Sequence, residues 1–112
     1  HPRPQPAVDA VCDLLDVLDV ATTTITFFYS GARDDMPSVS LPRERPGWMV
    51  SRIFGEGIDV VDETLDASEV KGADLVAMAT SGHHGFLDAL RGSTTERVLR
   101  DLRCPLLAVP SS

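Results

Sequence analysis

The segment 78–94 combines residue types and spacings that suit the binding of a phosphate group. Gly82 and Gly85 allow backbone conformations that other residues avoid, and they let main-chain N–H groups approach a ligand closely. Gly92 precedes a predicted helix, whose first turn has unpaired N–H donors and a partial positive charge. Hydroxyl groups at that turn come from Ser93 and Thr94. These groups could bind phosphate oxygens without a large positive charge.

A structural explanation of the same residues remains open. Ser93 and Glu96 have the spacing of a capping box, in which each side chain satisfies a backbone N–H at the start of a helix. The glycines could simply be turn residues, and the Gly-Lys-Ser/Thr of a Walker A loop is absent. The residue types therefore leave a phosphate site and a capped helix as alternatives.

Two adjacent histidines, His83 and His84, could suggest a metal site or acid–base chemistry. Neighbouring residues point apart in most backbones, and no Cys, Asp or Glu cluster at ligand spacing accompanies them. We interpret them as solvated loop residues, with contact to a ligand as the alternative.

Four arginines surround the last predicted helix of an otherwise acidic chain: Arg91, Arg97, Arg100 and Arg103. Salt bridges along the helix explain them most simply, and the candidate partners are Asp88, Glu96 and Asp101. Arg91 or Arg97 could instead help to neutralise a phosphate.

Composition limits the class of protein. The chain has 112 residues and a formal net charge of −7, which fits one small domain and argues against nucleic-acid binding. No apolar run approaches the roughly 18 residues of a membrane span, and no signal-peptide pattern opens the chain. Cys12 and Cys104 stand alone in apolar surroundings, as reduced core thiols do. We therefore expect a cytoplasmic protein without a membrane partner.

Hydrophobic periodicity predicts helices alternating with strands. The first helix has Val8, Val11, Cys12, Leu15 and Leu18 inward and Asp9, Asp13, Asp16 and Asp19 on a solvated face, after an entry loop at 1–6. A second helix carries Ile58, Val61 and Leu65 on one face, and a third spans 93–102 with Val98, Leu99 and Leu102 inward. The predicted strands are 22–29, 48–54, 75–78 and 105–109, with a surface loop at 32–47. Trp48 is interpreted as a packing residue at a strand end.

This alternation predicts an α/β fold, an open parallel sheet with helices on both faces. In such sheets ligands bind beyond the carboxyl ends of the strands. The segment after Met78 stands at such a position.

Segments 72–99 and 103–110 closely resemble the universal stress protein family. The family pattern Gly-x2-Gly-x9-Gly-Ser/Thr falls on Gly82, Gly92 and Ser93, while Ala79 replaces its first glycine. The resemblance is weaker but collinear upstream, through the first helix and the strand at 22–29.

The resemblance implies an adenine nucleotide alpha hydrolase-like fold and ATP, with Mg²⁺ accompanying it. It places ribose and phosphate contacts at Met78, Ala79, Thr80, Gly82, Gly92, Ser93 and Thr94. No nucleophile or general base is identifiable, so we expect at most weak ATP hydrolysis. The alternative is a dimerisation or scaffold module of the same family that binds no nucleotide.

The family fold also opens with a strand that is central in the order 3-2-1-4-5 and ends in an aspartate near the nucleotide. This chain starts at the loop after that position, so we expect one domain, 1–112, without that strand or with a strand from another copy. Its absence would divide the sheet. The resemblance further implies a homodimer through the last strand, 105–109.

Overall fold

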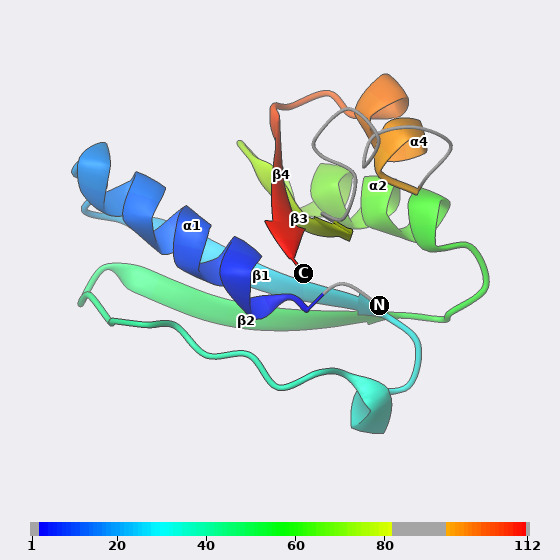
Figure 1. Ribbon diagram of the computed structural model, residues 1–112, viewed down its shortest axis with the longest axis horizontal. Coiled ribbons are helices and arrows are strands. Elements are labelled where there is room, and N and C mark those ends of the chain that lie inside the picture. Colours follow the sequence, from blue (N-terminus) through cyan, green and yellow to red (C-terminus); the bar gives the residue numbers. More distant parts are fainter. Residues whose placement is uncertain (1–2, 82–93, 112) are drawn as a thin grey trace.

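The computed structural model describes residues 3–81 and 94–111 (Figure 1). Helices and strands alternate along the chain, as the hydrophobic periodicity predicts. In order they are α1 (Gln5–Val17), β1 (Thr23–Ser30), the 3-10 helix η1 (Arg33–Asp35), β2 (Trp48–Gly55), α2 (Val60–Lys71), β3 (Val76–Ser81), α4 (Thr94–Asp101) and β4 (Leu106–Ser111).

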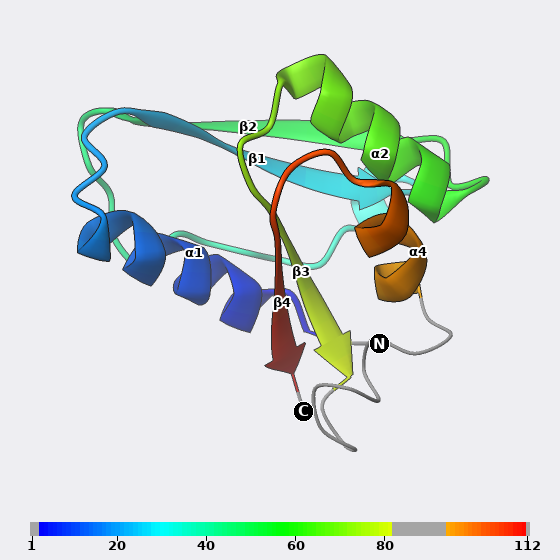
Figure 2. The same cartoon turned by 90° about the horizontal axis from the view of Figure 1, so that it is seen from above.

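The described strands form two separate sheets of two strands each, and both sheets are parallel. In the first, β1 and β2 pair from Thr23 opposite Trp48 to Ser30 opposite Gly55. In the second, β3 and β4 pair along their whole length. Figure 2 shows the two pairs running in different directions. The described strands therefore form two separate pairs and not one continuous sheet.

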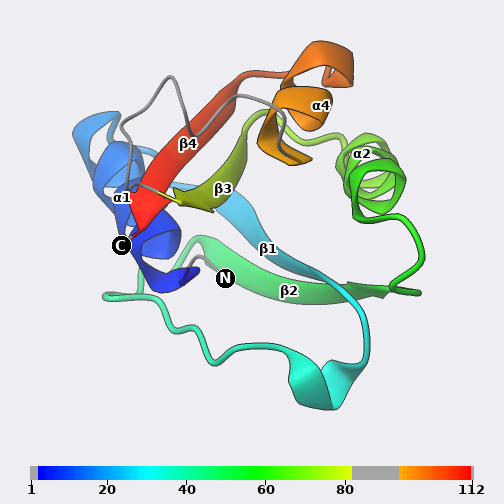
Figure 3. The same ribbon diagram turned by 45° about the vertical axis from the view of Figure 1, so that its right-hand side comes forward.

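Helices connect the two sheets. α1 packs against β3 and β4, whereas α2 packs against β1, β2 and α4 (Figure 3). The most deeply buried side chains lie on these helices: Cys12, Val61 and Val98. Trp48, at the start of β2, is buried as predicted, and its indole Nε1 donates to the Val20 carbonyl 2.9 Å away. The core therefore depends on helix contacts with both strand pairs.

The helix ends follow from local chemistry, with one correction to the sequence analysis. α1 begins at Gln5, inside the segment that we expected to be an entry loop. Pro4 is its N-cap residue and Pro6 lies in the first turn, where the missing N–H has no helical partner to lose. α2 ends at Gly72, whose φ of +61° suits a residue without a Cβ.

Three apolar residues that we expected to face inward are exposed. Leu18 is 63% exposed because α1 ends at Val17, and Ile58 is 82% exposed because it precedes α2. Leu99 is 48% exposed since its neighbour Val98 takes the inward position on α4. The helical pattern in the sequence thus continues past the ends of α1 and α2, to Leu18 and Ile58. On α4 it assigns an inward position to Leu99 that only Val98 occupies.

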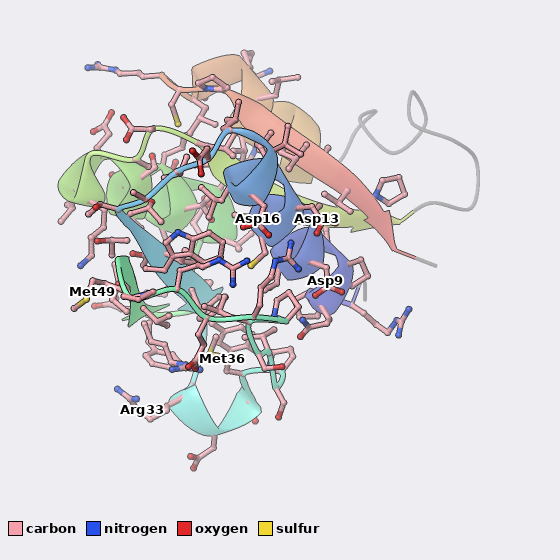
Figure 4. All side chains as sticks on the ribbon, turned by 90° about the vertical axis from the view of Figure 1, so that its left-hand side faces the viewer. Asp9, Asp13, Asp16, Arg33, Met36 and Met49 are labelled. Carbon is pink, nitrogen blue, oxygen red and sulfur yellow. The ribbon has the colours of Figure 1, made fainter. Side chains whose placement is uncertain are left out.

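The segment 36–46, which we call the strap, is held against α1. The Gln5 side chain makes two hydrogen bonds with the backbone of Ser40. Its Nε2 donates to the Ser40 carbonyl (2.7 Å), and the Ser40 amide donates to its Oε1 (3.1 Å). The Arg43 guanidinium donates to the carboxylates of Asp13 and Asp16. Figure 4 shows these aspartates in a row along α1 with Asp9. The acidic face of α1 is therefore not simply solvated, since it binds the strap.

Candidate functional site

The first part of the predicted nucleotide site lies on β3. Met78, Ala79 and Thr80 occupy consecutive positions, opposite Ala108, Val109 and Pro110 of β4. The side chains of Met78 and Ala79 are half-buried. Because β3 and β4 are parallel, their carboxyl ends, Ser81 and Ser111, lie at the same edge of the sheet. This is the edge at which parallel sheets bind ligands.

The last predicted contact, Thr94, is the first residue of α4. Gly82, Gly92 and Ser93 lie outside the described residues, and so do Gly85, Arg91 and the histidines His83 and His84. The proposed capping box also falls there in part, because it includes Ser93. The structure therefore describes the two elements that flank the phosphate segment: the carboxyl end of β3 and the start of α4. α4 is anchored on α2 by packing that includes the fully buried Val98.

A second polar cluster, which the sequence analysis missed, lies at the carboxyl ends of β1 and β2. Glu63 of α2 accepts hydrogen bonds from the backbone N–H groups of Gly57, Ile58 and Asp59 at 3.0, 2.9 and 2.8 Å. It also accepts from the Ser30 hydroxyl at 3.0 Å. These donors, first the Gly57 N–H, hold the pKa of the Glu63 carboxyl below its usual value.

The local sequence explains this cluster. Gly57 has a φ of +83°, which a residue with a Cβ rarely adopts, and the turn aims three successive N–H groups at one carboxylate. Asp59 is the N-cap of α2 and accepts from Val61 and Asp62, both at 3.1 Å. The sequence feature that could have indicated this cluster is the pair Gly55 and Gly57, followed by a helix with acidic residues in its first turn. The N–H donors at the start of α2 are therefore satisfied by the protein's own carboxylates.

The arginines around α4 pair mostly with another helix. Arg100 lies 3.8 Å from Asp101 within α4, which fits the expected pairing along the helix. Arg97 and Arg103 instead reach Asp59 (4.0 Å) and Glu69 (3.6 Å). Asp59 and Glu69 belong to the N-cap and the body of α2, so these pairs link the two helices. The expected pairing along the helix is thus found for Arg100, while the described pairs of Arg97 and Arg103 join α4 and the segment after it to α2.

The remaining predictions concern metals, thiols and membranes. Across residues 3–81 and 94–111, no group of three or more His, Cys, Asp or Glu side chains could hold a metal ion. Both cysteines are free thiols, and Cys12 is buried, which raises the pKa of its thiol. In the same part of the chain no helix has the length and apolar character needed to cross a membrane.

Comparison with known proteins agrees with this architecture. The model of the universal stress protein family matches residues 9–110. A curated relative, Universal stress protein MJ0531 of Methanocaldococcus jannaschii, is 41% identical over 54 residues, which are 48% of this chain and 31% of the relative. The chain thus matches about a third of that relative's length. No solved structure gives a significant match.

Proposed function

This chain belongs to the universal stress protein family, and we propose that it is a stress-response domain that binds ATP at the segment 78–94. In this proposal the phosphates lie against Gly82, Gly92, Ser93 and Thr94, with Mg²⁺ accompanying them. The ribose lies on the side of Met78, Ala79 and Thr80. No residue of the segment has the chemistry of an activated nucleophile, so the proposed role is binding with at most weak hydrolysis.

The observation that carries the proposal is the position of the segment between β3 and α4. β3 is a parallel strand that ends at Ser81, and α4 begins at Thr94, immediately after the Gly92-Ser93 pair. A glycine-containing connection from such a strand to a helix N-terminus suits an anion, because backbone N–H groups bind it without a formal positive charge. This matters in a protein with a net charge of −7.

The start of α2 provides a contrast that supports the same proposal. There Asp59 and Glu63 occupy the N–H donors, so an external phosphate would have to displace carboxylates. Asp and Glu are absent from 89–95, the residues that lead into α4. At the start of α4 the nearest acid in the sequence is Glu96, whereas α2 has Asp59, Asp62 and Glu63 at its start, so fewer carboxylates would oppose an anion at α4.

Calorimetry on the full-length protein tests the proposal. We expect MgATP to release heat in a saturable titration with the natural sequence and not with Gly92→Val, because a branched side chain obstructs the close approach of the backbone to phosphate. Ala79→Gly restores the first glycine of the family pattern and should tighten binding by removing a methyl group from the ribose side. Circular dichroism checks that each variant is folded.

Gly72→Asn is the matched control. Gly72 also has a special backbone conformation, but a Cβ there would meet no atom within 4 Å, and it ends α2 away from the segment 78–94. Asparagine tolerates the left-handed conformation, so this variant should fold and bind MgATP normally. Absence of heat with both the natural sequence and Ala79→Gly would reject nucleotide binding.

The second candidate function is a dimerisation or scaffold module without nucleotide. It is favoured by β4, an apolar strand that pairs with β3 alone within the described residues. An unpaired apolar edge favours pairing with a second copy, here through 105–109. Light scattering tests this directly: a dimer without any heat from MgATP would support the module, whereas a monomer would contradict pairing through β4.

A further inference from the structure

A hollow of about 330 Å³ lies between the strap and β2. Four consecutive strap residues form one wall, from Met36 to Val39, and Arg33, Arg52 and Phe54 complete the lining. Arg33 and Met36 are labelled beside it in Figure 4. Among the described residues, the lining comes from the segment 33–39 and from β2. The hollow is open to solvent on one side, so it is a surface site and not an enclosed cavity.

Both arginines of the hollow lie over aromatic rings. The Arg33 Cζ lies 4.3 Å from the centre of the Phe54 ring, and the Arg52 Cζ lies 5.3 Å from that of Phe27. A cation–π contact uses no hydrogen-bond donor, so the guanidinium N–H groups stay available for an anion. Within the described residues, neither arginine has a hydrogen-bond acceptor or a carboxylate partner.

This lack of partners distinguishes Arg33 and Arg52 from the arginines of the strap. Arg43 donates to Asp13 and Asp16, and Arg45 lies 3.4 Å from Asp16. The lining of the hollow contains two cations and no carboxylate, in a chain whose net charge is −7. The neighbouring carboxylates are Asp34 and Asp35 of η1, which are exposed and form no ion pair within the described residues. An anion in the hollow would thus meet two unneutralised guanidinium groups.

The rest of the lining is partly apolar. Met36, Val39 and Phe54 are half-buried, and Phe54 presents a ring already stacked with Arg33. Such a surface can hold a planar apolar body, while the two guanidinium groups bind a carboxylate or phosphate attached to it. A fully hydrated inorganic anion would use only the charged half of the lining.

We propose that the hollow bounded by the strap, Arg33, Arg52 and Phe54 binds a small organic anion with a planar apolar body. This proposal does not depend on nucleotide binding. Arg33 and Arg52 bind the anionic group, and Met36, Val39 and Phe54 contact the apolar body.

NMR titration of the full-length protein tests this site with three probes. Indole-3-acetate has both required parts, indole-3-acetamide lacks the charge, and inorganic phosphate lacks the apolar body. We expect indole-3-acetate to shift the side-chain Nε–H signals of Arg33 and Arg52 in a saturable manner. The other two probes should bind about tenfold more weakly, since each loses one class of contact.

Variants of the two arginines then test whether their charges bind the anionic group. Arg33→Gln and Arg52→Gln should each weaken binding of indole-3-acetate about tenfold, because a charge-assisted hydrogen bond is lost. The matched control is Arg100→Gln, which removes an exposed arginine on α4 and should leave binding unchanged. Gly92→Val should also leave it unchanged, which separates this site from the nucleotide proposal.

Three results would overturn the proposal. The first is equal affinity for indole-3-acetate and indole-3-acetamide, which requires no variant and would show that the charge is not bound. The second is unchanged affinity in both arginine variants. The third is the absence of any saturable shift at millimolar probe with the natural sequence.

Discussion

The two strand pairs have the same parallel topology but differ in what surrounds them. β1 and β2 have 8 residues each and form their contacts with α2. β3 and β4 have 6 residues each and pack against α1. Strands of the first pair carry exposed side chains such as Thr24, Met49 and Arg52, whereas 76–79 and 106–109 are half-buried throughout. The first pair therefore exposes side chains along the length of its strands, whereas these residues of the second pair are covered in part by neighbouring elements.

The polar contacts are distributed in the same way. Around the first pair, side-chain hydrogen bonds fix the connecting segments. Gln5 and Arg43 bind the strap, and Glu63 binds the turn before α2. The second pair packs against α1, which carries the completely buried Cys12. We infer that the first half is shaped by specific hydrogen bonds and the second half by helix packing. The following predictions test this difference.

The largest effect is expected at Trp48, which connects the first strand pair to the end of α1. Trp48→Ala removes a buried indole and its hydrogen bond to Val20, and should lower the free energy of unfolding by about 3–5 kcal/mol. Urea unfolding followed by circular dichroism measures this. Trp48→Phe retains an aromatic ring without the donor and should cost about 1–2 kcal/mol. Equal costs for the two variants would contradict a role based on packing.

A smaller effect is expected at Val98, which anchors α4 in the second half. Val98→Ala deletes two buried methyl groups and should lower the free energy of unfolding by about 2 kcal/mol. Its neighbour is the control, because Leu99 is 48% exposed and Leu99→Ala should cost about 0.5 kcal/mol or less. If Leu99→Ala were the more damaging variant in urea unfolding, the orientation of α4 described above would be wrong.

Much of the fold follows from the sequence because periodicity reports which residues are buried. The strands predicted at 22–29 and 48–54 correspond closely to β1 and β2. Prediction failed where a local rule was overridden. Prolines at the start of the chain suggested a loop, yet a helix tolerates proline in its first turn, so α1 begins at Gln5. Leu18 and Ile58 continue a helical pattern beyond helix ends that are set by capping, not by hydrophobicity.

The candidate site was less predictable for a physical reason. Local spacing could identify a glycine-rich connection before a helix, and the structure has Met78 and Ala79 on β3 and Thr94 at the start of α4. Contacts between distant segments have no such local signal. Arg43 lies 27 residues from Asp16, and Ser30 lies 33 from Glu63, so neither pair could be assigned from the sequence. The stacked arginines of the hollow were missed for the same reason.

Glu63 gives a prediction that depends on pH. Its pKa is lowered in the folded protein by the N–H groups of Gly57, Asp59 and Ile58 and by the Ser30 hydroxyl. A lowered pKa means that the carboxylate stabilises the fold above its unfolded pKa of about 4.3, and that this stability is lost as pH falls through the folded pKa. Glu63→Gln should therefore lower Tm at neutral pH.

The difference in Tm between Glu63→Gln and the natural sequence should shrink as the pH falls below about 4, because Glu63 is protonated first in the unfolded state and then, at its lowered pKa, in the folded state. Thermal unfolding at a series of pH values measures it. Glu56→Gln is the control, because Glu56 is exposed and makes no hydrogen bond within the described residues. A difference that stays constant down to pH of about 3 would mean that Glu63 acts through shape instead of charge.

The smallest global effect is expected at Arg43, although its local effect should be clear. Hydrogen bonds to Asp13 and Asp16 raise the pKa of its guanidinium, so it remains charged throughout the accessible pH range. Arg43→Gln should release the strap from α1 and speed hydrogen exchange at the Ser40 amide, which Gln5 otherwise protects. Overall Tm should change little, because exposed ion pairs contribute weakly. Arg45→Gln, which loses one longer contact to Asp16, should have a smaller effect on Ser40. Equal exchange at Ser40 in all three proteins would show that the strap is held by Gln5 alone.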